Sequence, residues 1–242
     1  NANLPTFFVS DVDLFGRQFI GRMRVENDAD DDFIGLVFGF QSNVNNGKPD
    51  SYYYLGWKKA NQVAVGSTNF GEAGFKLLRV INSANLNAND VRNLMWDGEN
   101  GTNIQVLARL DGTNTLGWAL NTDYDFTTFY ETNGQIAVSI RETATGLVRW
   151  QANVSDPVPL GPGRIGFLNH SQANVRYSGL AQSDTLTEGV FQLTARSGNP
   201  GLRALDGTPL DGNGDGTAGD NYVFRFVIDF TLPRVSNAAF RA

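Results

Sequence analysis

The run Asp30-Asp31-Asp32 places three carboxylates next to one another, immediately before an apolar stretch of the chain. Carboxylate oxygens are ligands that calcium prefers, and one calcium ion takes about six to eight oxygens from side chains, carbonyls and water. Adjacent carboxylates at the entrance to a strand can reach one ion if other groups complete the set. Two interpretations follow: a calcium site at Asp30, Asp31 and Asp32, or an acidic turn that is only solvated.

A second group of possible oxygen ligands lies near the C-terminus, in residues 210–221. Asp211, Asn213 and Asp215 have the 1, 3, 5 spacing of an EF-hand loop, and Gly216 follows where that loop turns sharply. The twelfth position carries a tyrosine in place of the usual glutamate. The loop is therefore predicted either to bind calcium or to form a turn rich in Gly, Asp and Asn.

The residues needed for common catalytic sites are scarce. His170 is the single histidine and the sequence has no cysteine, so a Ser-His-Asp triad, a His-rich metal site and a cysteine nucleophile are not expected. Glycosidases need two carboxylates that flank the scissile bond, and no expected strand carries such a pair. We therefore expect no enzymatic activity, with a glycoside hydrolase or lyase as the least favoured hypothesis.

Three aromatic residues are candidates for binding a sugar. Tyr52, Tyr54 and Trp118 offer flat apolar faces with a polar atom, which suits carbohydrate if the side chains are exposed. The alternative is that they belong to the core of the fold, where aromatic residues are common.

The elements that position these residues alternate with a period of two, which is typical of β-strands. One face of the strand after the acidic triplet carries Ile34, Leu36, Phe38 and Phe40. The other face carries Phe33, Gly35, Val37 and Gly39, and glycines at such positions indicate a bulge or the close approach of another segment. Residues 42–51 form the expected hairpin loop. The returning strand carries Tyr53, Leu55 and Trp57 on one face, and Tyr52, Tyr54, Gly56 and Lys58 on the other.

The rest of the chain favours an all-β fold. Further strands are expected at residues 7–9, 19–25, 75–81, 104–110, 136–140, 147–150, 164–168 and 174–180, with a short helical turn at residues 90–96. A chain of 242 residues with 12% aromatic residues and 27 glycines suits one large antiparallel β-sandwich. The formal net charge of −6 disfavours nucleic acid or an anionic membrane as the main partner.

The composition changes near residue 182, so we expect a main domain at residues 1–182 and a β-rich extension or partial module at 183–242. The extension has two expected strands, one starting at Phe191 and one at residues 222–230, separated by Gly- and Asp-rich loops. So few strands are marginal as an independent domain. The extension is expected either to dock elsewhere or to be part of a larger module.

Several motifs of residues 1–182 occur together in one known family. They are Asp30-Asp31-Asp32 with residues 33–41, Tyr54, Trp57-Lys58, Arg92-Asn93-Leu94-Met95-Trp96, Leu116-Gly117-Trp118, residues 134–141, Gly163-Arg164-Ile165-Gly166-Phe167 and residues 177–180. This set resembles the C-terminal, L-type-lectin-like domain of thrombospondins. The resemblance implies a concanavalin-like jelly-roll sandwich that is secreted, binds calcium and serves adhesion or matrix contact. It also implies that Asp30, Asp31 and Asp32 are metal ligands.

The sequence departs from the family in three respects. The loop at residues 42–51 is longer, the family's disulfide cannot form without cysteine, and the aspartate-rich repeats that precede the family's domain are absent from this sequence. The C-terminal segment around residues 206–216 resembles part of the immunoglobulin-like β modules of bacterial surface proteins. We therefore expect this chain to share the family's fold and calcium binding rather than its receptor binding.

These observations predict a non-catalytic, secreted or cell-surface module that binds calcium and supports adhesion or assembly. Its partner is expected to be a cell-surface or matrix protein or a glycan, with no nucleic acid and no membrane insertion. The chain is expected to be part of a larger multidomain protein. The main alternative is a calcium-dependent lectin.

Overall fold

The structure, a computed structural model, describes residues 5–26, 30–43, 45, 49–63, 70–85, 96, 100–131, 133–184, 189–198 and 200–228. Within these ranges, no helix is long and apolar enough to cross a membrane. Contacts divide the chain into two compact units, residues 1–185 and 186–242. The boundary expected from composition, near residue 182, stays a prediction.

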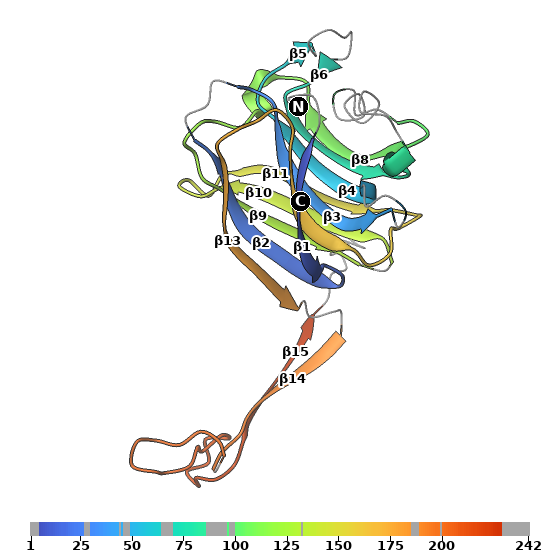
Figure 1. Ribbon diagram of the computed structural model, residues 1–242. Coiled ribbons are helices and arrows are strands. Elements are labelled where there is room, and N and C mark those ends of the chain that lie inside the picture. The colour runs from blue at the N-terminus through green and yellow to red at the C-terminus, as the bar shows by residue number, and fades with distance from the viewer. Residues whose placement is uncertain are drawn as a thin grey trace, which may run out of the picture. The chain divides into compact units, whose positions relative to one another are not determined.

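The first unit is a sandwich of two antiparallel sheets (Figure 1). The six-stranded sheet has the order β1 (Thr6–Asp13), β12 (Arg164–Asn169), β3 (Phe33–Ser42), β4 (Pro49–Lys58), β7 (Gly74–Val80), β8 (Ile104–Asp111). The five-stranded sheet has the order β11 (Val148–Ser155), β10 (Gln135–Glu142), β9 (Tyr124–Tyr130), β2 (Arg17–Val25), β13 (Val175–Asp184). Short elements β5 (Gln62–Val63), β6 (Phe70–Gly71), η1 (Ser83–Asn85) and η2 (Asn114–Leu116) lie in the connections. The predicted all-β jelly-roll sandwich is confirmed.

The main core lies between the two sheets and follows from the alternation of each strand. In β2, Phe19, Met23 and Val25 are buried while Ile20 is 40% exposed, as the sequence predicts. In β4, the face with Tyr53, Leu55 and Trp57 enters the same core. Burying these large side chains supplies the main driving force for closing the two sheets on each other.

A second apolar cluster covers the outer face of the six-stranded sheet. It contains Tyr52 and Tyr54 of β4, Leu78 and Val80 of β7, and Trp96 from the connection between β7 and β8. The strands of this sheet are therefore buried on both faces near the hairpin. Alternation alone shows which residues share a face, but it does not show that both faces are covered.

A bulge in β3 corrects one of the predicted faces. Phe40 does not share the inner face with Ile34 and Phe38 but belongs to the outer cluster. The pairing of β3 with β4 shifts register between Phe38 and Gln41, and Gly39 has a φ of +58°. An inserted residue reverses the side-chain alternation beyond it, and glycine adopts this φ without steric cost. A bulge is one of the two features that the glycines of this strand predict from the sequence.

Two other strands differ from the sequence prediction. In β8, a register shift opposite Leu77 and Leu78 puts Ile104 and Val106 against the outer cluster and Ala108 against the inner one. Strand β9 was missed, although its alternating Tyr, Phe and Thr residues carry the strand signature. The helical turn expected at residues 90–96 lies outside the described residues except for Trp96.

The second unit contains one two-stranded ribbon, in which β14 (Gly189–Ala195) pairs with β15 (Tyr222–Ile228) (Figure 1). The expected strand at residues 222–230 therefore pairs within the chain. Between the two strands, the loops are held by isolated bridges, including one between Asp211 and Asp220.

Candidate metal centre

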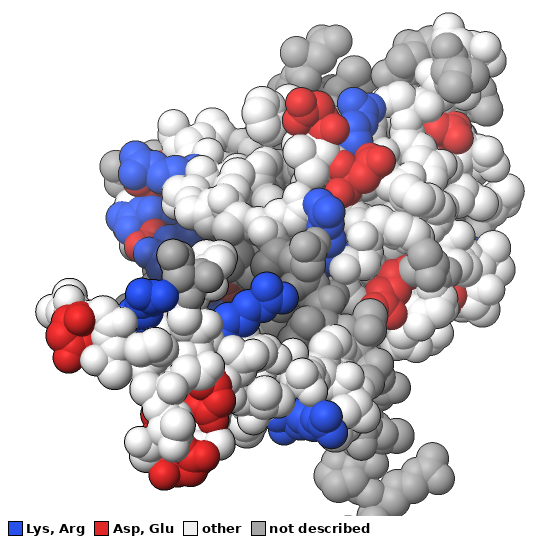
Figure 2. All heavy atoms as spheres, turned by 90° about the horizontal axis from the view of Figure 1, so that it is seen from below, with Lys and Arg blue, Asp and Glu red and all other residues white. Residues whose placement is uncertain are grey.

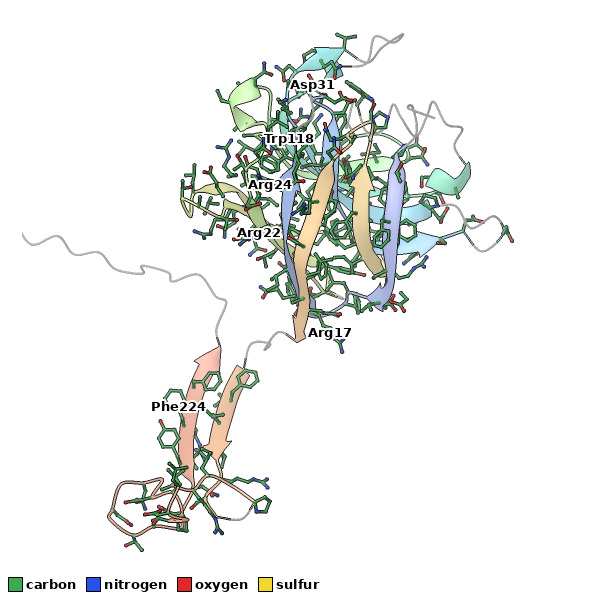
Figure 3. All side chains as sticks on the ribbon, turned by 60° about the vertical axis from the view of Figure 1, so that its left-hand side comes forward. Arg17, Arg22, Arg24, Asp31, Trp118 and Phe224 are labelled. Atoms are coloured by element: carbon green, nitrogen blue, oxygen red, sulfur yellow. The ribbon has the colours of Figure 1, made fainter. Side chains whose placement is uncertain are left out.

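The acidic triplet lies directly before β3, and one carboxylate oxygen from each of Asp30, Asp31 and Asp32 lies within 4.8 Å of the others. Asp32 is buried, with 6% of its surface exposed, while Asp30 and Asp31 are half-buried. Figure 3 shows Asp31 near Trp118, at the end of the sandwich opposite Arg17. The site is therefore at one end of the first unit, with one side open to solvent.

Strand pairing brings a buried lysine to the triplet. Phe33, the first residue of β3, pairs with Lys58, the last residue of β4. The Lys58 Nζ lies 3.2 Å from Oδ1 of Asp32 and 3.7 Å from Oδ1 of Asp31, and the side chain is fully buried. Nζ also donates hydrogen bonds to the carbonyl of Asp31 (3.0 Å) and to Oε1 of Gln62 (2.9 Å).

Aromatic side chains enclose the ammonium of Lys58. Its Nζ lies 5.0 Å from the ring centre of Phe33 and 4.7 Å from that of Trp96, both within the range of a cation–π interaction. The His170 ring lies against the same two aromatic residues, with centroid distances of 6.2 and 6.1 Å. His170 directly follows β12 and is buried beside the candidate site.

Sequence reasoning did not identify Lys58 as part of the site. It placed Lys58 on the face with Tyr52 and Tyr54, which is correct. The usable signal was a lysine at the end of an otherwise apolar strand whose partner strand begins at an acidic triplet. Such a charge needs a carboxylate when both faces of the sheet are buried.

The charges at this site are not balanced. Burial raises the pKa of Asp32, the negative charge of Asp30 adds to the effect, and the Lys58 ammonium acts in the opposite direction. Lys59 contributes a hydrogen bond from Nζ to the carbonyl of Asp30 at 3.4 Å. Three carboxylates thus lie beside two ammonium groups, the buried one of Lys58 and that of Lys59.

The donor set fits a hard cation in its chemistry. Carboxylate oxygens of Asp30, Asp31 and Asp32 are suitable calcium ligands, and their close grouping favours a cation. The fit has a limit, because Lys58 already contacts carboxylate oxygens of Asp31 and Asp32. A calcium ion would therefore depend mainly on Asp30 and Asp31, which are half-buried, with water completing the shell.

The C-terminal loop brings Asp211, Asn213 and Asp215 together. The Asp211 carboxylate accepts hydrogen bonds from the backbone N–H groups of Gly214, Asp215 and Gly216, at 2.8, 3.2 and 2.8 Å. Oδ1 of Asn213 accepts from the N–H of Asp215 at 2.8 Å, and a backbone hydrogen bond lowers the pKa of Asp215. Both a calcium loop and a self-contained turn are compatible with these bonds, so calcium at this loop stays a prediction.

The aromatic residues expected to bind sugar are not exposed. Tyr52, Tyr54 and Trp118 each expose 2% of their surface. The first two are part of the outer apolar cluster, and Trp118 is part of the main core, where its Nε1 donates to the carbonyl of Asp32 at 3.3 Å. The condition on which the sugar platform depended is therefore not met, because the outer face of β4 is covered.

Comparison of the sequence with known families finds one match that covers most of the chain. A family profile described as "Thrombospondin C-terminal region" matches residues 1–184. Bovine (Bos taurus) thrombospondin-2 is 30% identical over 184 residues, which cover 74% of this chain and 15% of that protein. Zebrafish (Danio rerio) thrombospondin-4-B is 28% identical over 189 residues, which cover 76% of this chain and 19% of that protein. The chain thus spans less than a fifth of the length of these relatives.

Comparison with solved structures finds lectin-like and carbohydrate-binding proteins of low sequence identity. The carbohydrate-binding module CBM66 from Bacillus subtilis aligns with a TM-score of 0.48 and 11% identity, over 76% of this chain and 84% of that one. The exoplasmic/lumenal domain of VIP36, in a form bound to calcium and mannose, aligns with a TM-score of 0.48 and 11% identity, over 76% and 75% of the two chains.

Proposed function

The chain belongs to the thrombospondin C-terminal region family, and on this basis we propose that residues 1–184 form a non-catalytic, extracellular lectin-like module that binds calcium and supports adhesion or assembly. The observation that carries the calcium proposal is the acidic triplet, in which three carboxylates cluster beside the buried ammonium of Lys58. The relatives are much longer than this chain, so adhesion or assembly is proposed for the module alone.

Calcium at the triplet has a structural role in this proposal. The ion supplies positive charge that offsets the repulsion among Asp30, Asp31 and Asp32, and Lys58 holds the inner side of the same cluster. A ligand that binds only the folded chain stabilises it by mass action, by about 2.7 kcal/mol at a hundred times its Kd. The same binding would fix the start of β3 against the end of β4.

The proposed partner is a cell-surface or matrix protein, or a glycan, met outside the cell. Figure 2 shows both acidic and basic side chains among the drawn residues, and the formal net charge is −6. Neither feature favours a polyanion such as nucleic acid. The module is proposed to act as one part of a larger protein at the cell surface or in secreted form.

Glycan binding is the second candidate function. The three aromatic residues that the sequence offers for sugar binding, Tyr52, Tyr54 and Trp118, are buried and do not support it. A different observation favours it, namely a groove on the outer face of the five-stranded sheet whose lining includes Arg22, Asp125, Thr127 and Ser178.

A calcium titration of chelator-stripped protein by calorimetry, with melting curves in parallel, tests the main proposal. The wild type is compared with Asp31→Ala, with Asp215→Ala for the C-terminal loop, and with Asp11→Ala, an exposed acid in β1, as the control. We expect binding heat and a higher Tm with calcium in the wild type and in Asp11→Ala. In Asp31→Ala, the binding heat of the triplet site and the rise in Tm that it causes should both be lost. A second, separate loss in Asp215→Ala would support the loop site.

Absence of calcium binding heat in the wild type, together with an unchanged Tm on chelation, would refute the calcium proposal. In that case the acidic run would be a turn held by Lys58 at Asp32, with Asp30 and Asp31 facing solvent without an ion. Binding that persists in Asp31→Ala and disappears in Asp215→Ala would transfer the site to the C-terminal loop.

A further inference from the structure

A groove with a volume of about 430 Å³ lies on the five-stranded sheet, where β13, β2 and β9 are neighbours. This volume is in the range of sites that bind small molecules. The groove is distinct from the acidic triplet and is lined by Ile20, Gly21, Arg22, Asp125, Phe126, Thr127, Ser178 and Gly179. In Figure 3, Arg22 and Arg24 lie along β2, between the end of the sandwich that carries Asp31 and the end that carries Arg17.

An irregularity of β13 creates this groove. Ser178 pairs with Arg22 and Ala181 pairs with Ile20, so two residues of β13 stand opposite the single residue Gly21. Gly179, within this bulge, has a φ of +60°. Bulges bend a strand and disrupt its pairing, and they are over-represented both at sheet edges, where β13 lies, and next to active sites. The regular sheet surface is thereby interrupted above Gly21 and the core residue Phe126.

The side chains around the groove offer hydrogen-bond donors and acceptors next to one another. Arg22 Nε donates to Oδ1 of Asp125 at 2.8 Å, and the two side chains remain 41% and 43% exposed. Thr127 and Ser178 add hydroxyl groups from the neighbouring strands. Ile20, 40% exposed, supplies an apolar surface beside them. A sugar ring is complementary to this set of side chains. Its adjacent hydroxyls both donate and accept hydrogen bonds, and its C–H groups form an apolar face.

The charges on this face are nearly balanced. Arg22 is paired with Asp125, Arg24 lies 3.5 Å from both Glu26 and Asp123, and Arg176 lies 3.3 Å from Glu26. Each of these arginines therefore has a carboxylate partner. A surface without a field of one sign does not select sulfated or otherwise polyanionic glycans. An uncharged saccharide is the ligand that matches this balance.

We propose that the groove bordered by Ile20, Arg22, Asp125, Thr127 and Ser178 binds a short stretch of a neutral glycan. Arg22 and Asp125 bind a pair of neighbouring hydroxyls, Thr127 and Ser178 bind further hydroxyls, and Ile20 packs against the apolar face of a ring. The inference rests on the glycan-binding form of the proposed function and does not require calcium at the triplet.

A printed array of neutral oligosaccharides, with sulfated and sialylated oligosaccharides at matched density, tests the inference with the full chain in calcium-containing buffer. The strongest neutral hit is then titrated as free oligosaccharide by calorimetry. Asp125→Asn and Thr127→Val change the groove with little change in volume, and Gln151→Ala, on β11 of the same sheet, is the control. We expect binding of neutral glycans that weakens by about tenfold or more in Asp125→Asn and Thr127→Val, and by less than about twofold in Gln151→Ala. Melting curves confirm that each variant is folded.

Three results would overturn the inference: no binding to any neutral glycan, binding confined to sulfated or sialylated glycans, or neutral-glycan binding that both groove variants retain. Calcium heats measured on the same preparation separate the two proposals. Glycan binding without calcium binding refutes the calcium site and leaves the groove standing, whereas calcium binding without glycan binding does the reverse.

Discussion

The ammonium of Lys58 lies 3.2 Å from Oδ1 of Asp32, and both side chains are buried at one end of the sandwich. The two residues are 26 positions apart in the sequence and meet because β3 and β4 pair in a register that sets Phe33 opposite Lys58. The pair therefore links the hairpin register to the charge balance of the acidic triplet. A slip of one residue would place Lys58 on the opposite face of the sheet.

Removing the lysine is expected to be strongly destabilising. Lys58→Met keeps the apolar stem but leaves Asp32 without its cation, and breaking a buried pair on one side costs about 3–5 kcal/mol in the free energy of unfolding. Urea unfolding measures this. Lys58→Met combined with Asp32→Asn should recover much of the loss, because the uncompensated charge is then absent. Lys59→Met, at a half-buried position, is the control. A loss below about 1 kcal/mol in Lys58→Met would show that the pair is not a major contribution to stability.

A buried network around Asp156 is expected to be equally sensitive. Asp156 is fully buried, and its carboxylate accepts hydrogen bonds from Tyr53 Oη at 2.9 Å and Arg79 Nη1 at 2.7 Å. Asp156→Ala should lower the free energy of unfolding by about 3–5 kcal/mol, because it leaves the Arg79 guanidinium without its carboxylate partner. Asp123→Ala removes one partner of a partly exposed pair with Arg24 and should cost about 1 kcal/mol or less. Equal effects of the two substitutions in urea unfolding would contradict this account.

Alkaline pH is expected to destabilise the fold through its buried tyrosines. Burial raises the pKa of Tyr52, Tyr53, Tyr54, Tyr130 and Tyr177 above the ordinary value of 10.0. Below pH 10 their contribution to stability is complete, because the phenols are neutral in both states. Above pH 10 the unfolded chain ionises first, so stability falls by up to about 1.4 kcal/mol per group and pH unit.

Urea midpoints measured from about pH 8 to about pH 11 check this tyrosine prediction. Tyrosinate absorbance from the buried groups should appear together with unfolding. Full ionisation of these tyrosines while the circular dichroism spectrum stays native would show that they are not buried as described.

The bulge in β3 is expected to require glycine at position 39. With φ at +58°, a side chain is strained, and a Cβ would lie 3.2 Å from both Tyr130 Oη and Tyr53 Cδ2. Gly39→Ala should therefore cost about 1–2 kcal/mol or more. Gly101→Ala is the matched control, because a Cβ there meets nothing within 4 Å, and its effect should stay within about 1 kcal/mol. Thermal unfolding of both variants measures the difference, and equal Tm values would refute the requirement.

The sequence alone was sufficient for the local part of this description. Period-two alternation located most strands of the sandwich and the two faces of β4, because side-chain direction along a strand depends only on neighbouring residues. The acidic triplet and the spacing of Asp211, Asn213 and Asp215 are also local features. Strand β9 carries the same alternation in Tyr124, Phe126, Thr128 and Tyr130 and could have been predicted from it.

Only the tertiary structure decided what covers each face and which distant residues meet. The outer face of β4 is buried in a cluster that includes Phe7 of β1, Phe40 of β3 and Trp96, so Tyr52 and Tyr54 are core residues. Phe40 changed faces because the bulge at Gly39 shifts register, and the groove beside Arg22 needs three strands that are far apart in the chain. Burial, register and cross-strand contacts depend on which strands pair, and a period of two in one strand carries no information about its neighbours.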